Sequence, residues 1–293
     1  MRTLFNLFSF IAFSFLVCCP LFSNDQKTAN VAMVKSILDG RLEFFRSTSI
    51  YSPLPGAAFQ SFPFYSYYAT GMDSAICNGI MEDNGQRTPS EAEIDKAVEF
   101  FKSRNVPFIW WSSSKNLEEK GFQFGGILIG IALDISKGIR GAPPSSSDLT
   151  IKIAGNESDT RAFSELAVNA FGMNPSTLDQ FAAINYATMK NGEAVHFMAY
   201  LKGKLVGTAT LSTTETTSGV WNLGTLPEHR KIGVGGALVH AALVEAKKLN
   251  YPYVMAILMP KGMAWGLFTK LGFEDTSSFL FYVHGIAAEE LEK

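Results

Sequence analysis

The sequence has very few cysteines, and their positions exclude a disulfide-stabilised fold. Of the 3 cysteines in 293 residues, Cys18 and Cys19 fall in the first, apolar segment, which leaves Cys77 alone. A single thiol cannot form an intrachain disulfide, so the body of the chain folds without oxidation. The sequence also has no group of Cys, His and acidic residues at the spacing of metal ligands, and we expect no metal.

A strong excess of charge is missing as well. The formal net charge is −2 at pH 7, and Lys and Arg are not clustered, which argues against a nucleic-acid partner. Hydrophobic residues make up 47% of the chain, and this content excludes intrinsic disorder. A length of 293 residues favours two domains over one. We expect small-molecule or protein partners, and the sequence does not indicate an oligomeric state.

Residues 1–23 differ from the rest of the chain. Arg2 is their only charged residue, and a mostly apolar run from Leu4 to Cys19 precedes a polar segment. The run is shorter than the about 20 apolar residues of a spanning helix and is typical of a signal peptide or a short uncleaved membrane anchor. We expect an exported or membrane-tethered protein with transient membrane contact through residues 1–23. A true start at Met33, giving a cytoplasmic protein, is the alternative.

A Pro- and Ser-rich segment at 141–148 marks the clearest domain boundary. It predicts an N-terminal domain over 30–140 and a C-terminal domain over 149–293. In the second domain, periodicity predicts a strand, two helices, three strands, a glycine loop, a helix, a strand, a helix and a strand. The expected ranges are 149–153, 158–171, 176–189, 195–201, 205–212, 219–225, 234–249, 253–259, a short helix ending at 270, and 279–283.

The glycine loop is the most informative stretch. It contains Arg230, Gly233, Gly235 and Gly236 between a predicted strand and a predicted helix. Glycines let backbone N–H groups approach a ligand, and a helix N-terminus favours an anion, so we expect a phosphate or pyrophosphate site. The spacing fits neither the Walker loop G-x-x-x-x-G-K-[ST] nor the dinucleotide fingerprint G-x-G-x-x-G.

The loop does fit R-x-x-G-x-G, read as Arg230, Gly233 and Gly235, and it follows Leu226-Pro227 at the end of a strand. This pattern, in this order of elements over about 140 residues, resembles the GNAT superfamily of N-acetyltransferases. The resemblance implies an α/β (α+β) fold in which the strands beside the loop helix splay apart. It also implies acetyl-CoA as acyl donor and a small-molecule or peptide amine as acceptor.

The N-terminal segment repeats part of this plan. Strand, helix, strand, helix, Gly-Phe and strand occur over 74–133 and again over 219–283, with Gly121-Phe122 matching Gly272-Phe273. In the first copy, residues 82–85 predict a turn, Ser90 and Glu93 predict a capping box at the start of the helix, and 113–120 predicts a short helix. The aromatic and Pro-rich region 47–68 is not expected to form regular helix. The chain therefore resembles a tandem GNAT protein with two lobes, each a mixed, mostly antiparallel sheet flanked by helices. Residues 82–92 have neither G-x-G nor Arg-x-x-Gly, so we expect a degenerate N-terminal lobe and one CoA per chain.

The resemblance also assigns a cofactor site, residue by residue. Backbone groups of Gly224, Thr225 and Leu226 would face the pantetheine and thioester, and Arg230 would lie at the loop start. The pyrophosphate would contact Lys231, Ile232, Gly233, Val234, Gly235 and Gly236. Phe268 occupies the place of the Tyr that protonates the departing thiolate in the family, and Phe cannot donate a proton.

Catalytic residues are poorly indicated. His196 and Tyr200 share one face of a predicted strand, and Asn222 is expected beside the cleft. Imidazole titrates near neutrality, so His196 is a candidate proton relay, although a strand histidine is more often structural. The leading hypothesis is an N-acyltransferase that moves an acetyl group from acetyl-CoA to an amine by direct attack. The alternative, suggested by Phe268 and the leader, is a non-catalytic CoA-binding or interaction module.

Overall fold

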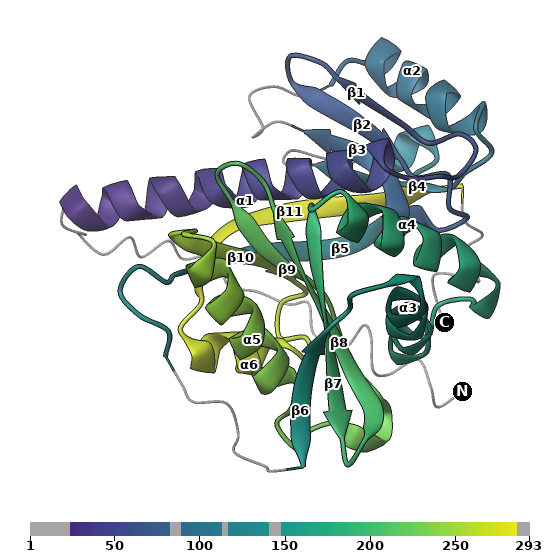
Figure 1. The fold of residues 1–293 in the computed structure, drawn as a ribbon. Coiled ribbons are helices and arrows are strands. Elements are labelled where there is room, and N and C mark those ends of the chain that lie inside the picture. Colours follow the sequence, from purple (N-terminus) through teal and green to yellow (C-terminus); the bar gives the residue numbers. More distant parts are fainter. Residues whose placement is uncertain (1–23, 83–88, 113–116, 141–147, 286–293) are drawn as a thin grey trace, which may run out of the picture.

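The computed structural model describes residues 24–82, 89–112, 117–140 and 148–285, with side chains from residue 32 onward. The predicted leader at 1–23 and all but the last residue of the predicted linker at 141–148 lie outside these ranges. Eleven strands form one continuous sheet in the order β1-β2-β3-β4-β11-β5-β10-β9-β8-β7-β6 (Figure 1).

The helices and strands follow one another along the chain with these bounds: α1 (Asn24–Ile50), β1 (Ala58–Ser61), β2 (Tyr65–Ala69), β3 (Asn78–Glu82), α2 (Glu91–Lys102), β4 (Phe108–Ser112), β5 (Gln123–Asp134), β6 (Leu149–Ile153), α3 (Glu157–Phe171), α4 (Leu178–Lys190), β7 (Ala194–Leu201), β8 (Lys204–Thr213), β9 (Ser218–Thr225), α5 (Val234–Lys248), β10 (Tyr253–Leu258), α6 (Trp265–Leu271) and β11 (Glu274–His284). The predicted order of elements in the C-terminal half is confirmed.

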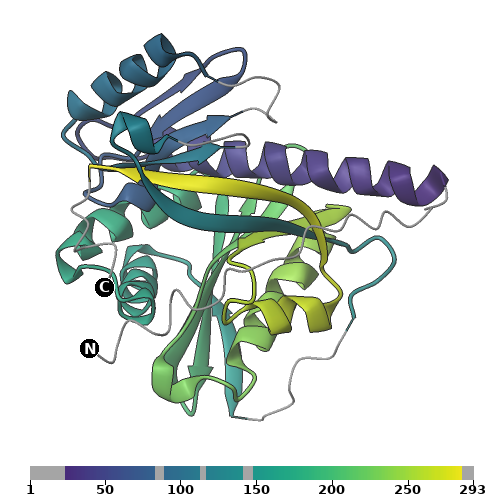
Figure 2. The ribbon, with the colours of Figure 1, turned by 180° about the vertical axis from the view of Figure 1, so that it is seen from behind.

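The two halves of the chain exchange their last strands. β5 leaves the N-terminal half and pairs with β10, from Tyr253↔Asp134 to Leu258↔Ile129. β11 leaves the C-terminal half and pairs with β4, from Leu280↔Ser112 to His284↔Phe108. β5 and β11 also pair with each other in the middle of the sheet, where Figure 2 shows two long crossing ribbons. The sequence repeat predicts two lobes, but nothing in it indicated this exchange.

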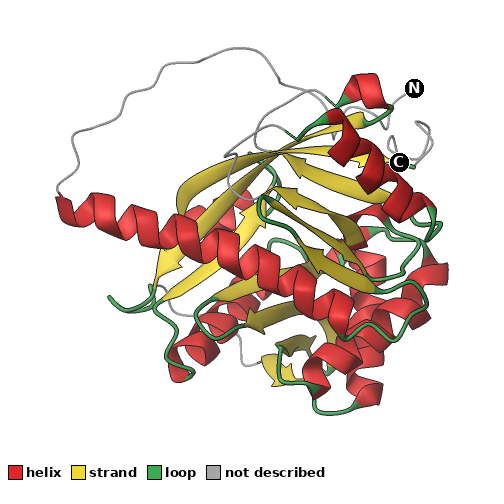
Figure 3. Ribbon diagram, turned by 90° about the horizontal axis from the view of Figure 1, so that it is seen from above, coloured by secondary structure: helices red, strands yellow, loops and turns green. Residues whose placement is uncertain are grey.

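Helices cover both faces of the sheet. α1 lies along one face over the central strands, where Ile37 packs with Ala132 and Met255 (Figure 3). α3 and α4 cover the same face farther along. α5 and α6 cover the opposite face of the C-terminal strands, and α2 covers that face of the N-terminal strands. The mixed sheet with flanking helices agrees with the predicted fold class.

Around residue 50 the sequence prediction was wrong. The aromatic and Pro-rich region 47–68 was expected to lack regular helix, whereas α1 continues to Ile50 and β1 and β2 follow. In the last turn the hydroxyls bond to the helix itself, since Thr48 Oγ1 donates to the Phe44 carbonyl and Ser49 Oγ to the Phe45 carbonyl. The first proline of this region is Pro53, which comes after the helix has ended.

The N-terminal lobe differs from its counterpart where a cofactor cleft would lie. β3 and β4 pair in parallel from Gly79↔Ile109 to Met81↔Trp111, almost to the end of both strands. The predicted capping box of α2 is confirmed, because the Ser90 side chain accepts from Glu93 N–H and the Glu93 carboxylate accepts from Ser90 N–H. The Ser90 and Glu93 side chains therefore cap this helix start. The predicted turn after Glu82 lies at 83–88, outside the described residues.

The predicted short helix at 113–120 is represented in the described residues by one turn of 3-10 helix, Glu118–Lys120. Within the ranges that the structure describes, no helix combines the length and the apolar character needed to cross a membrane.

Candidate functional site

The glycine loop forms a sharp connection between β9 and α5. A 3-10 turn at Pro227–His229 follows β9, and Lys231 adopts a positive φ of 63°. Gly233, with φ of 96°, is the N-cap of α5 and lies in the left-handed region, which favours glycine. Among the residues that the structure describes, no side chain caps this helix. The start of α5 therefore contrasts with the self-capped start of α2.

The loop leaves several backbone donors without a partner. Within the described part of the chain, the recorded hydrogen bonds use the N–H of Arg230, to the Pro227 carbonyl, and next that of Ala237, to the Gly233 carbonyl. None uses the N–H groups of the six residues between them, which are Lys231, Ile232, Gly233, Val234, Gly235 and Gly236. Lys231 and Ile232 are exposed and the three glycines half-buried, so these donors lie where a ligand with hydrogen-bond acceptors can reach them.

Arg230 holds the loop rather than extending into solvent. Its Nε donates to the Thr225 carbonyl at 3.0 Å, and its Nη2 donates to the Ala170 carbonyl at 3.2 Å. These bonds connect the loop to the end of β9 and to the last turn of α3. Arg230 is thus a positioning residue for the loop backbone.

A cleft opens beside the loop because β9 and β10 separate. The two strands pair in parallel only at Val254↔Ser218 and Met255↔Gly219. Beyond Gly219, β9 continues to Thr225 without pairing to β10. The splay implied by the resemblance is therefore present on the C-terminal side, while the matching strands β3 and β4 stay paired.

A cavity of about 710 Å³ connects this cleft with the face covered by α1 and α4. Its walls come from both halves of the chain, with Phe44 and Phe45 from α1, Trp111 from β4, and Trp221 and Asn222 from β9. The Phe44 and Trp221 rings stack with centroids 4.2 Å apart. The size and the apolar walls are those of a small-molecule site.

Comparison with known proteins relates part of the chain to a known family. Residues 161–273 match the model of the acetyltransferase (GNAT) family. The chain contains a GNAT-family acetyltransferase domain. None of the curated proteins matches the chain at a significant level.

Solved GNAT structures have a fold similar to that of most of this chain. A GCN5-related N-acetyltransferase from Kribbella flavida aligns with a TM-score of 0.55 and 12% identity over 89% of this chain and 95% of that one. A GCN5-related N-acetyltransferase from Sphaerobacter thermophilus aligns with a TM-score of 0.58 and 15% identity, over 75% of this chain and 76% of that one. A tandem GNAT protein from the clavulanic acid biosynthesis pathway aligns with a TM-score of 0.54 and 14% identity, over 90% of this chain and 97% of that one. At these identities the likeness shows the fold alone.

The predicted cofactor residues fall into two groups in the GNAT domain. Those from Gly224 to Gly236 lie on the end of β9 and the loop, outside the cavity lining. Phe268 lines the cavity from α6, is 2% exposed, and packs edge-on against Phe273 at 4.9 Å between ring centroids. It offers a hydrophobic wall at this position.

The candidate His196 is locked in a buried chain of hydrogen bonds. Its Nε2 lies 3.0 Å from the Asn185 carbonyl, which only accepts, so Nε2 carries the proton. Its Nδ1 lies 2.9 Å from Thr210 Oγ1 and accepts from that hydroxyl. Burial lowers the pKa of His196 to about 4. The imidazole is therefore neutral at pH 7, with both nitrogens occupied, and is not placed to act as a general base.

The chain of bonds continues to Asn222. Its Nδ2 donates to Thr210 Oγ1 at 3.2 Å, and its φ of 49° is left-handed. The register shifts here, because Thr210 pairs with Trp221 and Thr208 with Gly224, which makes a β-bulge. The bulge lies where the cleft opens. The hydrogen-bonded residues Asn185, His196, Thr210 and Asn222 therefore fix the shape of β9 at that point.

The candidate Tyr200 and the lone thiol of Cys77 are less informative for catalysis. Tyr200 does not line the cavity, and Lys152 Nζ lies 5.0 Å from its ring centroid. Cys77 does line the cavity, but burial raises the pKa of its thiol to about 11, so it is not a nucleophile at pH 7. No group of metal-binding side chains is found in the parts of the chain that the structure describes.

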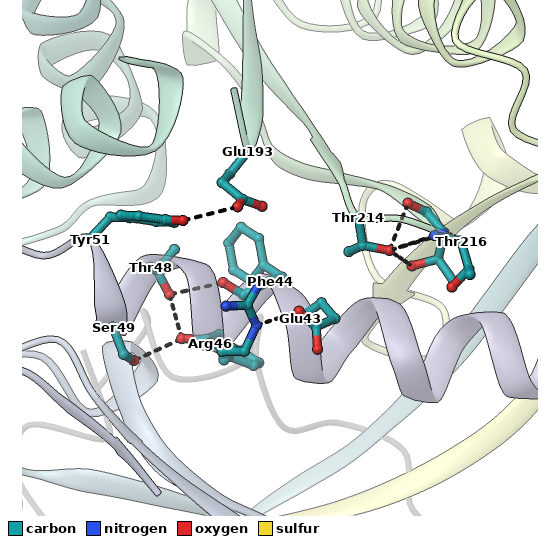
Figure 4. Close-up of polar contacts among 11 residues, drawn as sticks. Glu43, Phe44, Arg46, Thr48, Ser49, Tyr51, Glu193, Thr214 and Thr216 are labelled. Atoms are coloured by element: carbon teal, nitrogen blue, oxygen red, sulfur yellow. Dashed lines mark hydrogen bonds and ion pairs between the residues drawn. The ribbon is translucent and has the colours of Figure 1, made fainter. Parts of the chain in front are cut away.

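Sequence reasoning missed Glu193. It lies between α4 and β7, lines the cavity, and accepts a hydrogen bond from the Tyr51 hydroxyl at 3.3 Å (Figure 4). It also missed the contribution of α1, which supplies four lining residues, Phe44, Phe45, Ser47 and Thr48. A lone Glu after a helix gives no pattern in a sequence, and the contact with Tyr51 spans 142 positions.

Proposed function

We propose that the chain is an acyl-CoA-dependent N-acyltransferase that moves an acetyl group from acetyl-CoA to an amine by direct attack. One observation carries the proposal. Six consecutive loop residues with unbonded N–H groups lie at an uncapped helix start, beside strands that separate into a cavity. This arrangement suits a ligand with a diphosphate at one end and a reactive group at the other.

The residues present fit coenzyme A. The loop from Lys231 to Gly236 would bind the pyrophosphate through its backbone amides, while Arg230 holds the loop against Thr225 and Ala170. The pantetheine would lie along the unpaired end of β9. When bound, acetyl-CoA supplies an acetyl thioester. The cavity would bring a neutral amine to it and exclude water, which are the contributions of proximity and desolvation.

The proton balance follows from the chemistry. The amine nitrogen forms a bond to the acetyl carbon, and the carbon–sulfur bond breaks with its electron pair on sulfur. The proton that the amine loses is released to solvent water, from which the free CoA thiolate is protonated after it leaves. His196 does not take this proton, since its Nδ1 already accepts from Thr210. Phe268 does not give one to the departing thiolate, which leaves unprotonated because it is a good leaving group.

The test uses the full chain with labelled acetyl-CoA and a panel of amines. A Gly235→Glu variant introduces a carboxylate beside the proposed diphosphate site, and we expect it to abolish CoA binding. Gly235→Ala is the matched control, because its Cβ meets only the flexible end of Leu267 at 3.3 Å, and it should retain binding. Normal CoA affinity in the Gly235→Glu variant would contradict the loop assignment.

A second function is favoured by Phe268. Without an acid at this position, the chain is a candidate CoA-binding module that does not catalyse transfer. Binding of CoA by the wild-type chain with no labelled product from any amine of the panel would support this alternative over the enzyme.

We further propose that residues 1–23 direct export or attach the protein to a membrane, as their composition suggests. Mass spectrometry of the mature protein would show the N-terminus. A chain that retains Met1, or starts at Met33, and fractionates with soluble cytoplasmic proteins would contradict the proposal.

A further inference from the structure

The cavity beside the cleft contains a single charge. Among the described residues that line it, Glu193 is the only one with a charged side chain at pH 7, since burial keeps His196 neutral. The other lining residues are mostly aliphatic and aromatic, with a few hydroxyl and amide groups. A carboxylate in such a site favours a cation and repels an anion, and no lining Lys or Arg is present to bind a carboxylate ligand.

Glu193 is held in place by bonds on both sides. Its N–H donates to the Thr188 carbonyl at 3.0 Å, and its carbonyl accepts from Thr213 N–H at 3.1 Å. Its Oε1 accepts from the Tyr51 hydroxyl, as Figure 4 shows. No recorded bond of the described residues uses the second carboxylate oxygen, Oε2. The carboxylate is therefore positioned and has an acceptor to spare.

A nearby cation does not neutralise this carboxylate. Arg46 is close enough that Glu193 contributes to raising the pKa of Arg46. However, Arg46 makes its ion pair with Glu43, and no ion pair between Arg46 and Glu193 within 4.0 Å occurs among the described residues. Glu43, Arg46 and Glu193 together carry one net negative charge.

Glu193 lies far from the cleft along the sheet. Its carbonyl bonds to Thr213, which pairs with Ser218 at the start of β9. Asn222 is two strands away from Glu193 and four residues along β9 from Ser218. With strands about 4.8 Å apart and a rise of about 3.3 Å per residue, the two backbone positions are roughly 15 Å apart. The apolar walls, including the stacked Phe44 and Trp221, lie along the cavity that joins them.

From this arrangement we infer that the acceptor is a two-ended amine with an apolar body. One end is an ammonium group that binds Glu193 and does not react, and the other is the amine that reaches the cleft. The aromatic walls add cation–π attraction for the ammonium. This inference rests on the proposed acyl transfer for the role of the second amine, but the ammonium site at Glu193 can be tested without turnover.

The test is calorimetry on the full chain with CoA present, using three ligands that share an eight-carbon chain. Octamethylenediamine has an ammonium at both ends, octylamine has a methyl group at the far end, and ω-aminooctanoic acid has a carboxylate there. We expect the diamine to bind at least about tenfold more tightly than octylamine, the gain typical of a hydrogen bond to a charged group. The amino acid should bind most weakly.

Two variants identify the group responsible. Glu193→Gln keeps the acceptor for the Tyr51 hydroxyl and removes the charge, so the diamine should lose its advantage while octylamine affinity stays within about twofold. Glu215→Gln is the matched control, since Glu215 is exposed on the adjacent β8–β9 turn, does not line the cavity, and changes the net charge equally. It should preserve the diamine preference.

Three results would overturn the inference: no binding of any of the three ligands, a diamine that binds no better than octylamine, or a preference that survives Glu193→Gln. The proposed function fails separately. Glu193-dependent diamine binding without acetylation would contradict the acyl transfer and leave the ammonium site intact. Acetylation of amines with no dependence on Glu193 would support the acyl transfer and contradict the ammonium site.

Discussion

The Nδ1 atom of His196 lies 2.9 Å from the Oγ1 atom of Thr210, and it accepts a hydrogen bond from the Thr210 hydroxyl. Because Nε2 donates to the Asn185 carbonyl, Nδ1 is the acceptor and the imidazole is a fixed neutral tautomer. The residue that the sequence offered as a base therefore positions β8 and β9 instead.

This geometry predicts acid sensitivity. The unfolded chain protonates His196 near pH 6.5, whereas burial lowers its pKa in the folded protein to about 4. Between these values the unfolded state binds more protons, so stability falls as the pH falls, by about 3 kcal/mol in total from this residue. Denaturant titrations at several pH values from 7 to 4 would measure this loss of unfolding free energy. His196→Gln should be less stable at pH 7 and show a flatter pH dependence in this window.

The same variant separates structure from catalysis. If His196 only positions β9, the pH profile of acetyl transfer should keep its shape in His196→Gln, with a reduced rate. Loss of an ionisation near neutrality from that profile would instead assign the histidine a catalytic role.

Arg230 should act on CoA affinity through the loop backbone. Its two bonds, to the Thr225 and Ala170 carbonyls, need the guanidinium geometry, so Arg230→Lys should weaken CoA binding nearly as much as Arg230→Ala. Each variant should also lose about 1 to 2 kcal/mol of stability. Calorimetry and denaturation give both quantities. Full rescue of affinity by Lys would show that the charge, rather than the positioning of the loop, matters.

Phe268→Tyr should increase the turnover number of acetyl transfer. A phenol at this position of α6 would offer a proton to the departing thiolate, which Phe268 cannot do, while the packing on Phe273 is kept. The KM for acetyl-CoA should change little. Steady-state kinetics of the two proteins would check this, with Phe268→Leu as a control that keeps the apolar wall and adds no acid. An unchanged turnover number in the Tyr variant would contradict it.

The exchanged strands predict how the chain behaves when it is divided. Residues 149–293 alone lack β5, which pairs with both β10 and β11, and would expose two long strand edges. We expect this half to be insoluble when it is produced alone and soluble when it is co-produced with residues 24–140. A monomeric, folded C-terminal half in sedimentation and circular dichroism would contradict the exchange.

Local signals were enough to predict most elements of the fold. The capping box at Ser90, the alternating pattern of β7 and β8, and the glycine loop each depend on neighbours in the sequence, and all three are found in the structure. The exchange of β5 and β11 depends on pairings between residues far apart in the sequence, such as Tyr253 with Asp134 and His284 with Phe108. Each strand has the same apolar pattern whichever lobe it joins, so periodicity could not distinguish the two arrangements.

The sequence predicted the backbone part of the candidate site but not its side-chain part. Its backbone part, the loop after Pro227, has a motif because glycine is required at a particular conformation. Its side-chain part does not, because Glu193, Tyr51 and Phe44 come together only after α1 crosses the sheet. Their roles depend on burial and on the charges around them, which a sequence without its fold does not give.

The most direct test of the account is a crystal structure of the full chain with coenzyme A. We predict one CoA per chain, with diphosphate oxygens within hydrogen-bond distance of the amides from Lys231 to Gly236 and the pantetheine between β9 and β10. The start of α2, closed by Ser90 and Glu93, should bind none. A coenzyme bound elsewhere, or a second one between β3 and β4, would contradict the account.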